Sequence, residues 1–167
     1  MITPTVASDQ MNTHLHLLID IARQEMRVLD EQDSIVRQYT VSTGKAGIGS
    51  VNGSGCTPTG NFLIAEKIGQ GEPLNTIYQS RRPCGSFPDR LPEGTTNSSD
   101  FILTGILWLN GLDADNANTH DRYIYIHGTH QTHLLGHPAS HGCIRLAPEH
   151  LAELMSLVET GTSVTIH

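Results

Sequence analysis

The stretch 123–146, YIYIHGTHQTHLLGHPASHGCIRL, holds the features around which the rest of the chain is organised. Residues 123–126 are β-branched or aromatic, which favours a strand, and this strand delivers His127 at its end. Gly128 then breaks the strand, and the glycine and proline of the following loop exclude a long regular helix. The loop returns the chain to Cys143, so we expect a strand-end imidazole and a loop thiol to meet in space.

The thiol of Cys143 needs a partner before it can act as a nucleophile. A free thiol has a pKa near 8.5 and is only a few per cent thiolate at neutral pH, a handicap that a neighbouring imidazole removes. Gly142 lets the backbone approach a substrate carbonyl closely, and the amides of Gly142 and Cys143 could point at a developing oxyanion. Cys143 is therefore a candidate nucleophile for acyl transfer. The alternative is a small buried hydrophobic residue.

Six histidines crowd the same part of the chain and suggest zinc as a rival chemistry. They are His120, His127, His130, His133, His137 and His141. Imidazole and thiolate are good zinc ligands, but these spacings fit neither the HExxH helix nor a structural zinc pattern. We therefore expect no metal and no cofactor, and we place His130, His133 and His137 in the loop or at the edge of the cleft.

Two short motifs resemble the active-site signature of the L,D-transpeptidase catalytic domain, also called the YkuD domain. They are Ile-His-Gly-Thr at residues 126–129 and Ser-His-Gly-Cys-Ile-Arg-Leu at residues 140–146. In that family the cysteine of the second motif is the nucleophile, the histidine of the first motif is its base, and the backbone carbonyl after that histidine orients the ring. The resemblance assigns these roles to Cys143, His127 and Gly128.

The resemblance also implies roles for the neighbours of these three residues. His141 and Ser140 would shape the pocket and the oxyanion hole. Thr129 belongs to the first motif and would line the substrate site. Arg145 stands where many members of the family have an asparagine, and its expected partner is a carboxylate of the substrate.

The N-terminal half predicts a series of strands. Residues 14–41 contain three short strands separated by polar turns, for which we expect an antiparallel meander. Residues 57–60, Thr-Pro-Thr-Gly, end a segment rich in glycine, serine and threonine and resemble the TPTG turn common in YkuD domains. In those domains the turn lies beside the cleft and leads into a strand, here residues 62–67. A plain glycine-rich turn explains the same letters.

Residues 69–100 contain four prolines and several glycines, which predicts an irregular segment. Long irregular loops inside compact domains are usually functional or mobile. We expect this segment to form a lid over the cleft, with one of Arg81, Arg82 and Arg90 contacting a substrate carboxylate. The alternative is a solvated surface loop whose charges serve solubility.

The C-terminal half adds a core strand and a helix. Residues 101–109 are continuously apolar, as expected for a strand covered on both faces. The acidic and amide side chains of residues 111–119 hint at calcium, but the EF-hand glycine and the distal glutamate are missing, so a polar turn is the better interpretation. Pro148 begins a predicted amphipathic helix that Gly161 closes, and residues 162–166 form a last strand.

Length and composition set the class of protein. A chain of 167 residues with 37% hydrophobic content suits one globular domain with a real core. We expect a mainly β fold over residues 1–167 with one or two helices, a YkuD-like β-sandwich of mixed sheets that carries the cysteine loop. A formal net charge of −7, with only ten Lys and Arg residues, argues against a surface for nucleic acid or an anionic membrane. A monomer is compatible with these features, and the oligomeric state stays open.

The sequence predicts a cytoplasmic protein. No Lys or Arg precedes Arg23, and polar residues interrupt the apolar stretch before it, which does not match a secretory signal. No run approaches the 18 apolar residues of a membrane span. The three cysteines, Cys56, Cys84 and Cys143, show no CxxC spacing and fit reduced thiols better than a disulfide framework.

The resemblance implies a reaction on murein tetrapeptide stems. The sulfur would attack the carbonyl of the third, L-centre diamino acid, and the terminal D-Ala would leave. In the cytoplasm water is the expected acceptor of the thioester, which gives an L,D-carboxypeptidase of murein recycling, whereas an amine of another stem gives an L,D-transpeptidase. A non-catalytic murein-peptide binding module is the alternative of another class, and the intact His127 and Cys143 argue against it.

Overall fold

The N-terminal strands have the alternating pattern of a half-buried sheet. The structure is a computed structural model that describes residues 14–167. Most of the N-terminal stretch before Arg23, which does not match a secretory signal, lies outside this range. In β1 (His16–Asp20), Leu17 and Ile19 are buried while their neighbours are partly exposed. β2 (Glu25–Leu29) and β3 (Ile35–Thr40) follow as an antiparallel meander, which confirms that prediction.

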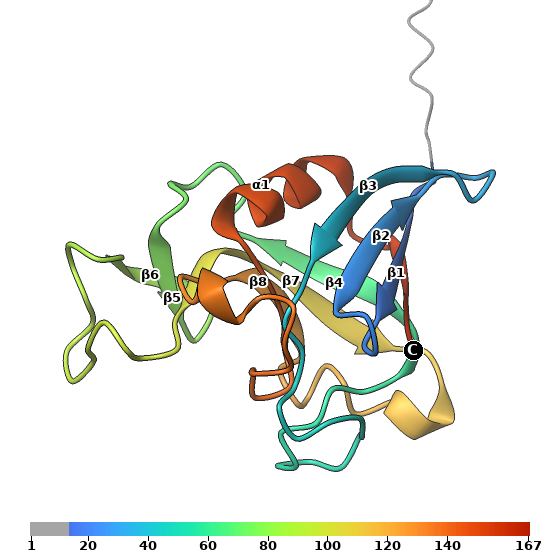
Figure 1. The fold of residues 1–167 in the computed structure, drawn as a ribbon, viewed down its shortest axis with the longest axis horizontal. Helices are drawn as coiled ribbons and strands as arrows, with labels where there is room; N and C mark the ends of the chain where they lie inside the picture. The colour runs from blue at the N-terminus through green and yellow to red at the C-terminus, as the bar shows by residue number, and fades with distance from the viewer. Residues whose placement is uncertain (1–13) are drawn as a thin grey trace, which may run out of the picture.

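The described strands join in one mixed sheet with the order β3-β2-β1-β10-β4-β7-β5-β6 (Figure 1). The strands not yet bounded in this order are β4 (Gly60–Ile68), β5 (Thr76–Gln79), β6 (Arg82–Ser86), β7 (Ile102–Gly111) and β10 (Ser163–Ile166). β8 (Tyr125–Gly128) pairs with β7, and β9 (Ile144–Leu146) pairs in parallel with β8. The predicted mainly β fold with mixed strand directions is confirmed.

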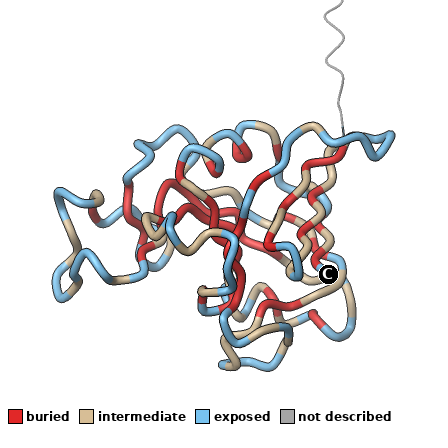
Figure 2. Tube along the Cα trace, viewed as in Figure 1, coloured by how far each residue is buried: buried red, intermediate tan, exposed pale blue. Residues whose placement is uncertain are grey.

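β7 lies at the centre of the molecule and carries much of the core. Its residues 103–109 are all buried, as predicted for a strand covered on both faces (Figure 2). Helix α1 (Pro148–Leu157) starts at Pro148, as predicted, and packs on β7 and β8. Its buried residues, Leu151, Leu154 and Met155, recur at helical spacing. Apolar burial on this face therefore holds the strand that carries the first motif.

The catalytic strand is displaced from its predicted position. β8 spans residues 125–128 instead of 123–126, because Tyr123 has a φ of 57°, in the left-handed region that a strand does not use. His127 consequently lies inside the strand and not at its end. The lid segment 69–100 is also more regular than expected, since it contains the β5–β6 hairpin, and β5 pairs with β7.

The acidic turn after β7 is tied to β4 by its own side chains. It contains a short 3-10 helix, η1 (Ala114–Asn116), and a second one, η2 (Thr132–Leu134), follows β8. Asp113 Oδ2 accepts the Asn61 N–H at 2.7 Å, and Asn116 donates to the Thr59 carbonyl at 3.1 Å. These polar groups thus stabilise the turn.

None of the helices within residues 14–167 has the length and apolar character that crossing a membrane requires.

Candidate active site

His127 is held in β8 with one ring nitrogen already engaged. Its Nδ1 lies 2.7 Å from the carbonyl oxygen of Gly128, and the side chain is almost fully buried. Because a carbonyl oxygen only accepts, Nδ1 carries the hydrogen, and Nε2 of the neutral ring is left with a free lone pair. The backbone of Gly128 therefore orients the ring so that Nε2 can take a proton.

A β-bulge in β7 lies opposite His127 and Gly128. The pairing of β7 with β8 skips Thr104 and Gly105, so β7 bends at this point. Thr104 has a φ of 77°, and its hydroxyl donates to the Leu74 carbonyl at 2.7 Å. The approach is so close that a Cβ on Gly128 would lie 2.6 Å from Thr104 Oγ1. Only glycine fits there without displacing the bulge.

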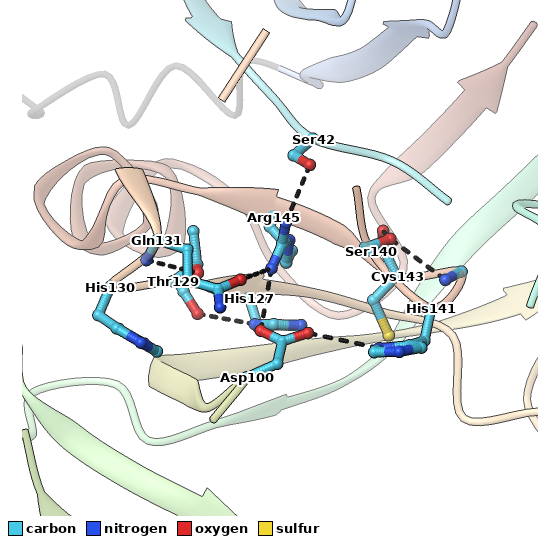
Figure 3. Close-up of polar contacts among 12 residues, drawn as sticks. Ser42, Asp100, His127, Thr129, His130, Gln131, Ser140, His141, Cys143 and Arg145 are labelled. Atoms are coloured by element: carbon cyan, nitrogen blue, oxygen red, sulfur yellow. Dashed lines mark hydrogen bonds and ion pairs between the residues drawn. The ribbon is translucent and has the colours of Figure 1, made fainter. Parts of the chain in front are cut away.

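Cys143 ends the loop that leads into β9. Its Sγ lies 3.4 Å from the carbonyl oxygen of Tyr123, and the Tyr125 N–H points at the sulfur from 3.4 Å. Parallel pairing of β9 with β8 brings this loop to the side of His127. Both side chains line one cavity of about 200 Å³, together with Asp100, Ile102, Ser140 and His141. Figure 3 shows Cys143 and His127 with Asp100, Ser140 and His141 around them.

Burial sets the protonation states of the pair. Removal from water raises the pKa of Cys143 to about 11, and the Tyr125 N–H opposes only part of this effect. Burial also lowers the pKa of His127, against a smaller opposing contribution from the Gly128 carbonyl. At neutral pH the pair is therefore a thiol beside a neutral imidazole, not a thiolate beside an imidazolium. The proton must move during the attack on a substrate.

Short polar contacts fix the loop around the thiol. The Ser140 hydroxyl donates to the Cys143 carbonyl at 2.6 Å and accepts the Gly142 N–H at 3.1 Å. The hydroxyl of Thr57, in the TPTG turn, donates to the Gly142 carbonyl at 2.9 Å. The expected use of the Gly142 amide in an oxyanion hole is therefore not observed, because Ser140 occupies that amide. The Cys143 amide is the one left for this role.

Arg145 lies in the interior and not on the wall of the cleft. Its side chain has no exposed surface, and its guanidinium donates to Asp100 at 2.9 Å, to Gln131 at 2.7 Å and to Ser42 at 3.1 Å (Figure 3). The expected contact with a substrate carboxylate is wrong for this reason. A carboxylate of the protein itself, that of Asp100, takes the place of the substrate.

The loop after β8 also differs from expectation. Thr129 is fully buried, and its hydroxyl accepts the Gln131 N–H at 3.0 Å. It therefore does not line the substrate site, contrary to the prediction. His130 packs between two aromatic rings, with centroid distances of 4.3 Å to Phe87 and 5.3 Å to Phe101. Within residues 14–167, no three His, Cys, Asp or Glu side chains gather in a way that could hold a metal ion.

The lid arginines have different surroundings. Arg81 lies over the rings of Trp108 and Tyr123, with centroid distances of 4.9 Å and 5.4 Å, and its guanidinium is 3.4 Å from the Tyr125 hydroxyl. Arg82 and Arg90 are exposed. Arg81 is thus the lid arginine that reaches the aromatic cluster beside Cys143.

Several residues of the site carried no signal in the sequence. Asp100, Gln131 and Ser42 belong to no motif, and they reach Arg145 from three separate segments. The β propensity of Tyr123 and Tyr125 predicts only a strand, although both contact the sulfur through their backbones. No pattern in the sequence indicates these backbone contacts with the sulfur.

The fold and the cavity define the class of protein: a mixed β-sheet domain in which a loop cysteine and a strand histidine share one pocket. Residues 14–166 match the family described as "YkuD: L,D-transpeptidase catalytic domain". The chain belongs to this family, and the resemblance drawn from the two motifs is confirmed over most of its length.

A relative agrees with this membership, and solved structures share the fold. "Putative L,D-transpeptidase YkuD" of Bacillus subtilis (strain 168) is 26% identical over 152 residues, covering 91% of this chain and 65% of that protein. An L,D-transpeptidase from Mycobacterium smegmatis has the same fold with a TM-score of 0.56 and 18% identity, over 93% of this chain and 59% of that chain. L,D-transpeptidase 3 from Mycobacterium tuberculosis, solved with a faropenem-derived adduct, has a TM-score of 0.57 and 18% identity, over 93% of this chain and 60% of that chain. This chain spans less than two thirds of the length of each.

Proposed function

We propose that this domain carries out cysteine-dependent acyl transfer on murein tetrapeptide stems. The observation that carries the proposal is the shared cavity of Cys143 and His127, in which the imidazole already has the tautomer of a base. In the first step, His127 Nε2 takes the Sγ proton while the sulfur attacks the carbonyl of the third, L-centre residue. The amide C–N bond then breaks, the amine of D-Ala takes the proton from His127, and a thioester remains on Cys143.

The donor would be held by Arg81 of the lid segment. No Asp or Glu within the described chain lies within 4.0 Å of its guanidinium, so this cation has no protein carboxylate to pair with. Tyr125 contacts Arg81 through its hydroxyl and Cys143 through its N–H, so this one residue bridges the cation and the nucleophile. A stem peptide that ends in a carboxylate supplies the missing anion. We therefore assign Arg81, rather than Arg82 or Arg90, to the substrate.

Water is the acceptor that we propose, which makes the domain an L,D-carboxypeptidase that trims tetrapeptide to tripeptide. The cavity beside the sulfur has about 200 Å³, below the range of about 300–1,000 Å³ usual for ligand pockets, and it admits a water more readily than a second stem. An amine of another stem is the second candidate. It is favoured by an adjoining cavity of about 420 Å³ that shares Asp100 and Ile102 with the first.

A hydrolytic activity suits soluble stems recovered from the wall, and we propose the cytoplasm as its compartment. The thiols of Cys56, Cys84 and Cys143 are all free, and Cys84 is exposed, which fits surroundings that keep cysteines reduced. Fractionation of cells that carry the tagged full-length protein tests this assignment. Recovery from the envelope fraction alone would contradict it.

The activity is tested by incubating the protein with a purified tetrapeptide, with and without an acceptor stem, and weighing the products. We expect tripeptide and free D-Ala in both reactions, whereas a cross-linked dimer as the main product would replace hydrolysis by transpeptidation. A carbapenem should add its mass to the wild type and to Cys84→Ala but not to Cys143→Ala. Tight binding of tetrapeptide without turnover or acylation would instead indicate a binding module.

A further inference from the structure

Asp100 joins the end of the lid segment to the catalytic cavity. It directly precedes Phe101 and β7, and it lines both the cavity of Cys143 and the adjoining one. Its Oδ1 accepts a hydrogen bond from Arg145 at 2.9 Å, and its Oδ2 lies 3.5 Å from Nδ1 of His141 (Figure 3). One carboxylate thus contacts a buried residue on one side and an exposed residue of the cavity lining on the other.

The inner contact holds Asp100 in a fixed place. Arg145 is fully buried, and it is the register partner of His127 in the β8–β9 pair. Its remaining contacts, to Gln131 and Ser42, come from neutral side chains, so Asp100 supplies its negative charge. A buried cation without its anion is strongly unfavourable, which keeps the carboxylate where it is. Asp100 is therefore anchored to the same strand pair that carries the catalytic histidine.

The outer contact reaches a second imidazole whose surroundings are opposite to those of the first. His127 is 4% exposed and its Nδ1 is bound to a carbonyl, so it serves the sulfur from inside. The side chain of His141 is 89% exposed and lines the same cavity, so solvent reaches it there. An imidazole with a carboxylate on one nitrogen presents the other nitrogen as a base.

We propose that Asp100 is a positioning residue that holds His141 with Nδ1 toward the carboxylate and Nε2 toward the acyl acceptor. This proposal rests on the acyl-transfer function proposed above. In the second half of the reaction, the acceptor water loses a proton to His141 Nε2 as its oxygen bonds to the thioester carbonyl. The C–S bond breaks, the tripeptide acid leaves, and the Cys143 thiolate recovers the proton from the imidazolium. His127 then serves the first half and His141 the second.

A double-mutant cycle on Asp100 and His141 tests the coupling. We expect Asp100→Asn and His141→Ala each to lower kcat about 100-fold, the lower end of what an aligned acid–base group contributes, with little change in KM. The double variant should be no slower than either single variant, because Asp100 acts through His141. Asp89→Asn, an exposed change in the same lid segment, should match the wild type. Additive losses in the double variant would overturn the proposal.

Two further measurements separate positioning from a merely structural role. Asp100→Asn combined with Arg145→Met removes both charges and should restore the melting temperature while leaving kcat low, whereas recovered activity would show that the ion pair only supports the fold. Nitrogen NMR of 15N-histidine-labelled protein should show the Nδ1–H tautomer of His141 in the wild type and its loss in Asp100→Asn. Absence of turnover with every murein peptide would refute the proposed function. An Nδ1–H tautomer of His141 that persists in Asp100→Asn would separately refute the positioning role of Asp100.

Discussion

The raised pKa of Cys143 gives the sharpest single test of the site. Burial moves this pKa from an ordinary value of 9.0 to about 11. The thiolate fraction at pH 8 then falls from about one in ten to about one in a thousand. A thiol this protonated reacts well only with an acylating agent that lets His127 take its proton. General alkylating agents should therefore react slowly with the folded protein at neutral pH.

The assay is a titration of the ultraviolet absorbance of the thiolate in Cys56→Ala/Cys84→Ala protein, with Cys143→Ser in the same background as the blank. We expect a midpoint close to 11 in the folded protein and near the ordinary value of 9.0 after unfolding. A folded midpoint below about 7 would mean a resting thiolate–imidazolium pair, as found at activated cysteines. That result would refute the conclusion that burial keeps the sulfur protonated until a substrate arrives.

The same shift predicts how stability changes with pH. The pKa of Cys143 in the folded state lies above its pKa in the unfolded state. The contribution of this thiol to the free energy of unfolding is therefore fully present below the unfolded pKa and is lost as the pH rises through about 11. A shift of this size corresponds to about 2 kcal/mol at most, since one pKa unit is 1.36 kcal/mol and Cys143 is partly exposed. Urea unfolding of the wild type and of Cys143→Ser across this pH range measures the difference.

The geometry of the site leads to three further predictions. Because burial lowers the pKa of His127, the rate of acylation by a carbapenem should be flat at neutral pH and fall only at a pH below its ordinary value of 6.5; a fall that begins above pH 7 would contradict this. Gly128→Ala should lower both the melting temperature and the acylation rate, because its Cβ would lie 2.6 Å from Thr104 Oγ1, and an unchanged rate would show that the bulge tolerates it. Arg81→Met should raise KM for a free-acid tetrapeptide about tenfold or more, because it removes a charged hydrogen bond of about 1.5–3 kcal/mol. KM for an amidated tetrapeptide should not change. Arg82→Met is the control, and equal effects of Arg81→Met on both peptides would refute the carboxylate assignment.

Local patterns in the sequence were sufficient for most of the strands and for the helix. The alternation around Leu17 and Ile19, the apolar run of β7 and the proline that starts α1 each express a short-range rule. Each element formed close to the place predicted by its rule, although α1 ends at Leu157 and not at Gly161. The position of β8 could not be read in this way. Its β-branched residues favour a strand, but the left-handed backbone at Tyr123 depends on tertiary contacts that no local window contains.

The roles of polar side chains were harder to predict than the elements that carry them. Arg145 follows the nucleophile by two positions within the same motif, and the motif therefore suggests a contact with the substrate. Strand alternation turns residues two positions apart to the same face, but Cys143 lies in the loop before β9, so this rule does not fix the direction of Arg145, which is buried. The partner that makes this burial acceptable, Asp100, lies 45 residues earlier in the chain. Such a pairing is visible only after folding.

The ion pair between Asp100 and Arg145 ties the end of segment 69–100 to the strand that follows the cysteine loop. The lid segment ends at Asp100, and β9 begins directly after Cys143, so the pair joins the two segments that border the cavity. An exposed ion pair would contribute little here, because water and salt screen it. This one has its cation fully buried, and separating the charges would leave an unpaired guanidinium in the interior. If residues 69–100 form the lid that we propose, its hinge must lie before Asp100, while Asp100 itself stays beside His141.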